Sequence, residues 1–101
     1  MAIDRGLNAG RWDWRAYDGA IFIQFNVPNE DLTGISFQIK CDALANSPYA
    51  MTVDNVTKEV TVTIPEGDMN ALSKQRHQYF FQHNANGSFA TLVAGYLLKV
   101  A

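Results

Sequence analysis

The chain has little that would support a disulfide framework, a membrane span or a nucleic-acid surface. Cys41 is its only cysteine, so neither an intrachain disulfide nor a thiolate metal cluster can form. No apolar run approaches the length of a bilayer span, and the first residues lack the apolar segment of a signal peptide. The net charge of −2 gives no broad basic surface for nucleic acid or anionic lipid. We therefore expect assembly in a reducing cytoplasm.

Residues that carry catalysis or bind metals occur without the spacing that such chemistry needs. No serine lies in a Gly-x-Ser-x-Gly turn, and neither a phosphate-binding loop nor a zinc-ligand spacing is present. His77 and His83 lie about 20 Å apart by strand rise, too far to chelate one ion. Cys41 occupies an inward position of an alternating strand, where it is a small hydrophobe. The sequence predicts no enzyme, no cofactor and no metal ion.

Short segments of alternating apolar and polar residues are the main signal present. They predict strands over residues 20–27, 35–41, 49–53 and 59–64. Asp68 is a predicted N-cap for one short helical turn. Six or seven short strands with frequent turns predict an all-β, antiparallel, immunoglobulin-like β-sandwich, with a small open barrel as the alternative. The inward residues predicted for the first two segments are Ile21, Ile23, Phe25, Val27, Ile35, Phe37, Ile39 and Cys41.

The C-terminal quarter predicts a hairpin. Residues 76–83 and 88–100 are joined by a turn that contains Asn86-Gly87, a pair that tolerates positive φ. The second strand is apolar on both faces and about twice the typical strand length, which predicts a bulge or kink at Ala94-Gly95. The inward residues are then Phe89, Thr91 and Val93 before the bulge, and Tyr96, Leu98 and Val100 after it.

Residues 1–19 form a predicted extended N-terminal arm, ahead of a sandwich domain over residues 20–101. The arm has no sustained periodicity but carries three large aromatic rings. Either these rings cap an edge of the core, or they anchor the arm on a partner protein, because tryptophan, tyrosine and arginine are frequent interface hot spots. The second interpretation gives these partner-binding residues: Arg11, Trp12, Trp14, Arg15 and Tyr17.

The order of several motifs resembles a known family. Asp31-Leu32-Thr33-Gly34 precedes an alternating strand, and Met51-Thr52-Val53-Asp54 precedes the strand at 60–64. Tyr79-Phe80-Phe81 and the apolar residues 91–100 complete the order. Over roughly residues 20–101 this resembles the immunoglobulin-like N-terminal domain of upper baseplate and tail-fibre proteins of tailed bacteriophages. In that family a DLTG turn opens the domain and an apolar strand closes it.

The resemblance implies a structural protein of the virion, assembled in the host cytoplasm and docked in symmetric copies on larger tail or head proteins. Family members usually continue into a fibre, whereas this chain stops at Ala101. The expectation is therefore a free-standing adaptor of the tail, baseplate or fibre region, or a capsid decoration protein. Two alternatives stay open: a carbohydrate-binding module that uses the N-terminal tryptophans, and a cytosolic β domain that binds another protein.

Overall fold

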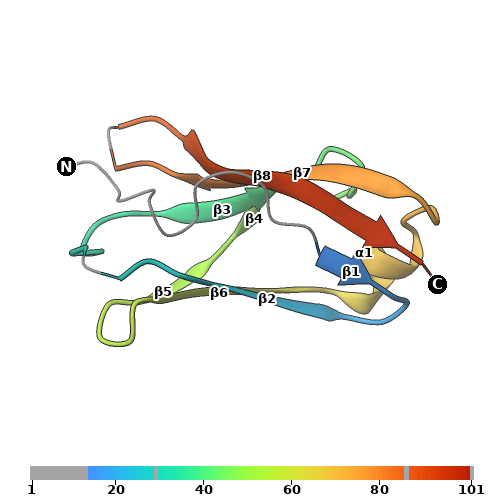
Figure 1. Cartoon of the computed structure of the whole chain (residues 1–101), viewed down its shortest axis with the longest axis horizontal. Coiled ribbons are helices and arrows are strands. Elements are labelled where there is room, and N and C mark those ends of the chain that lie inside the picture. The colour runs from blue at the N-terminus through green and yellow to red at the C-terminus, as the bar shows by residue number, and fades with distance from the viewer. Residues whose placement is uncertain (1–13, 29, 86, 101) are drawn as a thin grey trace.

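Two β-sheets face each other in a sandwich-like arrangement (Figure 1). The computed structural model describes residues 14–28, 30–85 and 87–100. Every strand pair is antiparallel except β1 with β8. The predicted all-β, two-sheet architecture is confirmed. In spatial order the five-stranded sheet holds β1 (Trp14–Ala16), β8 (Ala90–Lys99), β7 (Arg76–His83), β3 (Phe37–Lys40) and β4 (Tyr49–Ala50), and the three-stranded sheet holds β2 (Ile21–Asn26), β6 (Glu59–Ile64) and β5 (Thr52–Asp54).

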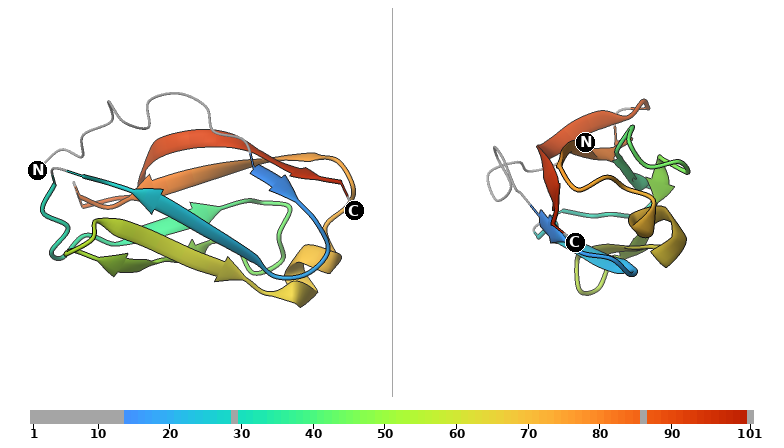
Figure 2. Two further views of the ribbon diagram at one scale, coloured as in Figure 1. Left: turned by 60° about the horizontal axis from the view of Figure 1, so that its bottom comes forward. Right: turned by 90° about the vertical axis from the view of Figure 1, so that its right-hand side faces the viewer.

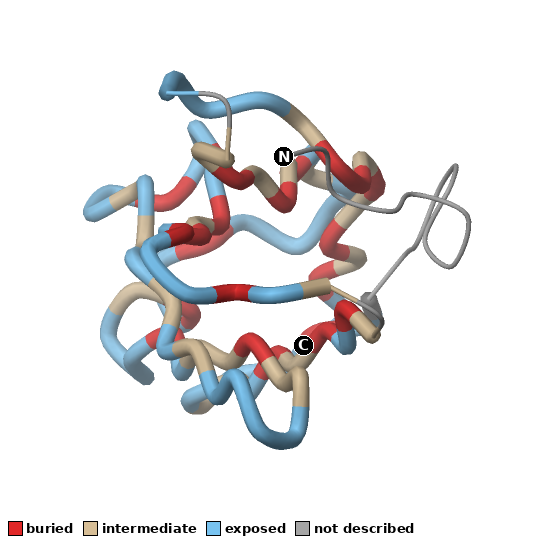
Figure 3. Tube along the Cα trace, turned by 90° about the vertical axis from the view of Figure 1, so that its left-hand side faces the viewer, coloured by how far each residue is buried: buried red, intermediate tan, exposed pale blue. Residues whose placement is uncertain are grey.

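The alternating segments bury the residues that the sequence predicts. Buried and exposed positions alternate along the strands (Figure 3). Seven of the eight inward residues predicted for the first two segments are buried, and Ile21 is half-buried against the core. The prediction succeeds because a strand with one solvated face sets its own register: a slip of one residue would expose the whole apolar set.

Three phenylalanine rings join the two sheets. Phe25 of β2 stacks on Phe81 of β7 with ring centroids 4.1 Å apart and planes 7° apart. Phe37 of β3 stacks on Phe81 with centroids 5.5 Å apart. All three rings are buried. Phe81 therefore contacts one ring from the facing sheet and one from its own sheet, at the centre of the core.

The predicted strand at residues 49–53 is wrong, because two short strands in different sheets replace it. β4 pairs with β3 in one sheet, and β5 pairs with β6 in the other. Met51 lies between them, and its N–H donates to the Phe37 carbonyl oxygen at 3.0 Å. In Figure 1 this segment crosses diagonally from one layer to the other. The chain thus changes sheet without a turn.

The bulge in β8 lies at Leu92, not at Ala94-Gly95 as predicted. Phe81 pairs with Val93, but the next residue of β7 pairs with Thr91, so Leu92 is the extra residue. Beyond the bulge, Lys99 lies on the inward face with Val93, so the prediction for this part of the strand is wrong. The wrong parity follows from Lys99, because a lysine is expected to face solvent unless it has buried partners, and the sequence does not reveal those partners. The predicted inward residues Tyr96 and Leu98 are half-buried and point outward, and Val100 and Phe89 are exposed.

The N-cap of helix α1 (Glu66–Asn70) lies three residues before the predicted cap. Pro65 is the N-cap residue, so the prediction for Asp68 is wrong. The Asp68 carboxylate instead accepts hydrogen bonds from the Tyr49 hydroxyl at 2.6 Å and from the Asn46 amide at 3.0 Å. Both bonds lower the pKa of Asp68. Burial raises the pKa of Tyr49, and so does its hydrogen bond to Asp68. Asp68 therefore ties α1 to the β3–β4 connection.

The end of the predicted arm belongs to the five-stranded sheet. β1 pairs in parallel with the end of β8, with Ala16 opposite Lys99. The Val100 N–H donates to the Ala16 carbonyl oxygen at 3.0 Å, and Ala16 is buried. Residues 1–13, the rest of the predicted arm, lie outside the described residues.

The aromatic stack predicts a large loss of stability when its central ring is removed. We expect Phe81→Ala to lower the free energy of unfolding by about 3–5 kcal/mol, because the cavity would lie between both sheets. The matched control is Phe89→Ala, since Phe89 is 44% exposed; it should change the value by about 0.5 kcal/mol or less. Urea denaturation followed by circular dichroism measures both, and equal losses would contradict the central role of Phe81.

Candidate functional site

The structure describes three of the five predicted partner-binding residues. Arg11 and Trp12 lie outside the described residues, and Trp14 is the first residue of β1. Arg15 and Tyr17 are exposed on either side of the buried Ala16. β1 lies directly beside the end of β8 (Figure 2). The structure therefore brings Arg15 and Tyr17 to one border of the five-stranded sheet.

An apolar stripe crosses the outward side of this sheet. Inward residues of β7 and β8, such as Tyr79 and Leu97, are fully buried, so their neighbours in sequence point outward. Cross-strand pairs place Phe80 opposite Ala94, and Leu98 opposite both Arg76 and Arg15. We call this surface the outer face, and define it by the outward residues Arg15, Lys40, Arg76, Gln78, Phe80, Ala94, Tyr96 and Leu98.

The outer face carries only positive charge. The five strands of its sheet contain no aspartate or glutamate. Its cations are Arg15, Lys40 and Arg76, and the Arg76 guanidinium lies over the Tyr96 ring at 4.5 Å from the centroid. The described carboxylates lie in the connections, in α1 and in the three-stranded sheet. An apolar stripe bordered by cations complements a partner surface on which carboxylates surround apolar groups.

Sequence reasoning missed most of the outer face. It placed Tyr96 and Leu98 inside and gave no role to Arg76 or Phe80. These residues share the outward side of one sheet, which becomes visible only when the strands are aligned side by side. The signal available in the sequence is the absence of acidic residues from 76–83 and 90–99, combined with outward cations.

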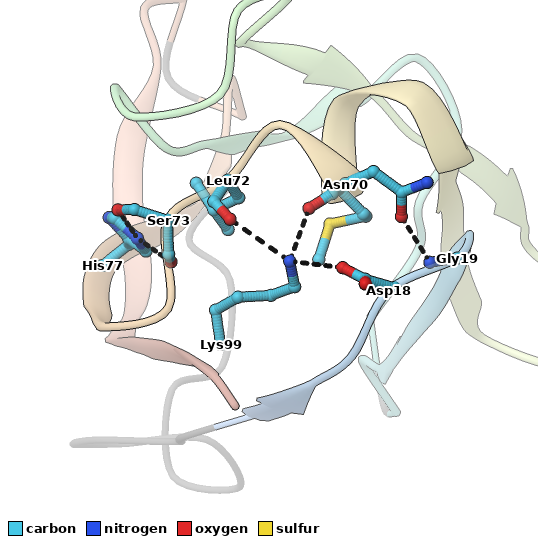
Figure 4. A network of polar contacts seen from close by, with 8 residues as sticks. Asp18, Gly19, Asn70, Leu72, Ser73, His77 and Lys99 are labelled. Atoms are coloured by element: carbon cyan, nitrogen blue, oxygen red, sulfur yellow. Dashed lines mark hydrogen bonds and ion pairs between the residues drawn. The ribbon is translucent and has the colours of Figure 1, made fainter. Parts of the chain in front are cut away.

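A buried lysine holds β1 in position beside this face. The Lys99 side chain is 1% exposed, and its Nζ forms an ion pair with Asp18 Oδ1 at 2.9 Å (Figure 4). Nζ also donates to the carbonyl oxygens of Met69 at 2.9 Å and Leu72 at 3.2 Å. The Met69 carbonyl lies in the last turn of α1 and the Leu72 carbonyl lies just beyond its end, where helix acceptors need outside donors. Lys99 therefore joins β8, α1 and the β1–β2 connection, which is a structural role.

The DLTG turn is also explained by the fold. Asp31 Oδ1 accepts the Thr33 N–H at 3.0 Å, and this bond lowers the pKa of the carboxyl group. The Asn55 side chain accepts the Leu32 N–H at 2.9 Å and donates to Asp31 Oδ1 at 3.1 Å. Leu32 is buried, and Gly34 has a φ of 74°. Each residue of the motif thus helps to close one end of the sandwich.

The described residues contain no group of three or more His, Cys, Asp or Glu side chains placed to hold a metal ion. Cys41 is buried, and burial raises the pKa of its thiol, which disfavours the reactive thiolate. Within the same residues, no helix has the length and apolar character needed to cross a membrane. The outer face is the candidate functional site because of its apolar stripe and its cations.

Comparison with known proteins finds no protein-family model and no curated protein that matches the chain. The resemblance to phage baseplate and tail-fibre domains therefore stays a prediction.

The Lys99 network predicts a loss of stability in Lys99→Met. Methionine fills similar space but removes the donor to the Met69 and Leu72 carbonyl oxygens and the ion pair with Asp18, although the Met69 oxygen keeps its bond from the Leu72 N–H. We expect the free energy of unfolding to fall by about 1–3 kcal/mol. The matched control is Lys74→Met, which changes an exposed lysine. Chemical denaturation of both variants tests this, and equal stabilities would contradict the role of the network.

Three hydrogen-bonded aspartates predict that the free energy of unfolding falls in acid. Hydrogen bonds hold the pKa of Asp31, Asp54 and Asp68 below the ordinary value of 3.8 in the folded state. Their stabilising effect is complete above that value and is lost as pH falls through the lower folded pKa values. We expect the free energy of unfolding to fall below about pH 4, and to fall less in Asp31→Asn. An identical pH profile for this variant, measured by urea denaturation, would contradict the contribution of Asp31.

Proposed function

We propose that this chain is a non-enzymatic structural protein of a tailed-bacteriophage virion. It acts as a small adaptor or decoration protein that docks through its outer face on a larger tail or head protein. Assembly takes place in the host cytoplasm, and several symmetric copies occupy the particle. The proposal uses no cofactor, nucleic acid or membrane.

The strand order supports an immunoglobulin-like fold, which the resemblance implies. The order β2-β6-β5 corresponds to strands B, E and D of such a sandwich, and β8-β7-β3-β4 corresponds to G, F, C and C′. Phe25 and Phe81 stack between the sheets at the place where antibody domains carry their disulfide. Tyr79, two residues before Phe81, is fully buried. The aromatic stack would then replace the disulfide in a chain with one cysteine.

The composition of the outer face is the observation that carries the docking proposal. A solvated sheet face is normally polar, whereas this one carries a stripe of the half-buried residues Phe80, Tyr96 and Leu98. Arg15 and Arg76 lie on both sides of Leu98 in the strand register. Aromatic residues and arginine are the types that contribute most to binding energy in interfaces. The carbohydrate-binding alternative depends on the N-terminal tryptophans, of which Trp12 lies outside the described residues.

The direct test is mass spectrometry of gradient-purified particles of the phage that encodes the chain. We expect the chain in a stoichiometric ratio to the major structural proteins. Its absence from the particles, together with abundant free protein in the lysate, would contradict a virion role and favour the cytosolic binder.

The outer face predicts which variants lose incorporation into particles. We expect Arg15→Glu to reduce incorporation about tenfold or more, because it places a carboxylate in the cationic border. Lys74→Glu is the matched control, since it makes the same charge change at an exposed residue of the α1–β7 connection that is not part of the outer face. Equal incorporation of the two variants would contradict docking through the outer face.

A deletion of residues 1–13 distinguishes the contribution of these residues to incorporation from that of the outer face. It leaves β1 in the sheet but removes Arg11 and Trp12. A truncated protein that still folds but is no longer incorporated would assign binding to the arm, whereas normal incorporation would leave the outer face as the docking surface.

A further inference from the structure

In the part of the chain that the structure describes, four strands lie at the edges of the two sheets, and three of them have features that discourage pairing with another chain. β1 has three residues and includes Arg15. β4 has two residues and directly follows Pro48. β5 has three residues and ends at Asp54. Short length, charge and proline are the usual protections of edge strands.

β2 has none of these protections. Its six residues, Ile21–Asn26, contain no charge and no proline, and they pair with β6 without a bulge. Among the described residues, no other strand pairs with β2. Phe22 lies on the solvent side of this strand and is 58% exposed. β2 is therefore a regular, uncharged edge with an exposed aromatic ring.

The hydrogen bonds to β6 show which backbone groups point away from the sheet. The Val27 N–H donates to the Lys58 carbonyl oxygen at 2.9 Å. Because hydrogen-bonded and non-hydrogen-bonded pairs alternate in an antiparallel ladder, Ile23 and Phe25 also bond toward β6. The N–H and C=O groups of Phe22 and Gln24 then point outward. They present donors and acceptors to an incoming strand.

We propose that β2 pairs in antiparallel orientation with β2 of a second copy of this chain. The two three-stranded sheets then form one continuous six-stranded sheet, β5-β6-β2 followed by β2-β6-β5 of the other copy. An uncharged strand can pair with an identical strand, because no like charges oppose each other across the twofold axis. Each exposed Phe22 gains a cross-strand neighbour on the same face.

The dimer leaves the outer face accessible, because that face belongs to the other sheet. A single strand pair is a small interface, so we expect a dissociation constant between roughly 1 μM and 1 mM. This inference rests on the edge of β2 alone and is independent of the phage assignment.

Amide hydrogen exchange at two protein concentrations tests the pairing. In the dimer the N–H groups of Phe22 and Gln24 become protected, whereas they exchange rapidly in the dilute monomer. The amides of Ile23 and Phe25 are internal controls, because their bonds to β6 protect them at both concentrations. Sedimentation equilibrium on the same samples should show a defined dimer at high concentration.

A charge on the edge should prevent the pairing. We expect Phe22→Lys to weaken dimerisation about tenfold or more, because each dimer loses two aromatic cross-strand contacts and gains two nearby cations. The matched control is Thr63→Lys, which puts the same charge on the same face beside Phe22, but on the central strand β6. Circular dichroism checks that both variants fold, and the control should dimerise like the unmodified protein.

Several outcomes would overturn the proposal. A monomer at all concentrations up to about 1 mM would exclude self-association of useful strength. A dimer that persists in Phe22→Lys, with Phe22 and Gln24 amides still exchanging rapidly in the unmodified protein, would place the interface elsewhere. Open-ended association without a defined dimer would identify β2 as an aggregation site. Protection that appears only when another protein is added to a monomeric chain would assign this edge to a foreign strand.

Discussion

The stack of Phe25, Phe81 and Phe37 is the contact on which the arrangement of the two sheets depends. With one cysteine, the chain cannot join its sheets by a disulfide. Instead, Phe25 of one sheet and Phe81 of the other stack at the centre with nearly parallel ring planes. The stack fixes which residues of β2, β3 and β7 face inward, and therefore which residues of β3 and β7 face outward. The outer face is thus a consequence of the core.

The sequence predicts the fold well wherever one face of a strand is solvated. The alternation at 20–27 and 35–41 correctly identifies the buried residues, because each change of parity would expose an apolar set. β8 fails this rule, since it is apolar on both faces and its parity changes at Leu92. The segment at 49–53 fails for another reason: alternation reveals that a chain is extended, but not that Met51 lies where it passes between sheets.

The candidate site was less predictable than the fold, because it is assembled from strands that are distant in sequence. Arg15 and Tyr17 could be selected from their residue types alone. Their neighbours could not, since the pairing of Leu98 with both Arg15 and Arg76 requires the strand order. Lys99 shows the same limit: its burial depends on carbonyl groups of Met69 and Leu72, which local sequence does not bring near it. The DLTG turn, by contrast, is accounted for by local hydrogen bonds and one contact with Asn55.

The parallel pairing of β1 with β8 has a mechanical consequence. Trp14 and Val100 lie at opposite ends of this pair, so a pulling force applied between them acts along both strands. The backbone hydrogen bonds that join the strands would then be sheared together instead of breaking one after another. The ion pair between Lys99 and Asp18 adds a link at the C-terminal end of the two strands. A domain connected in this way resists extension through its first and last strands before its core is disturbed.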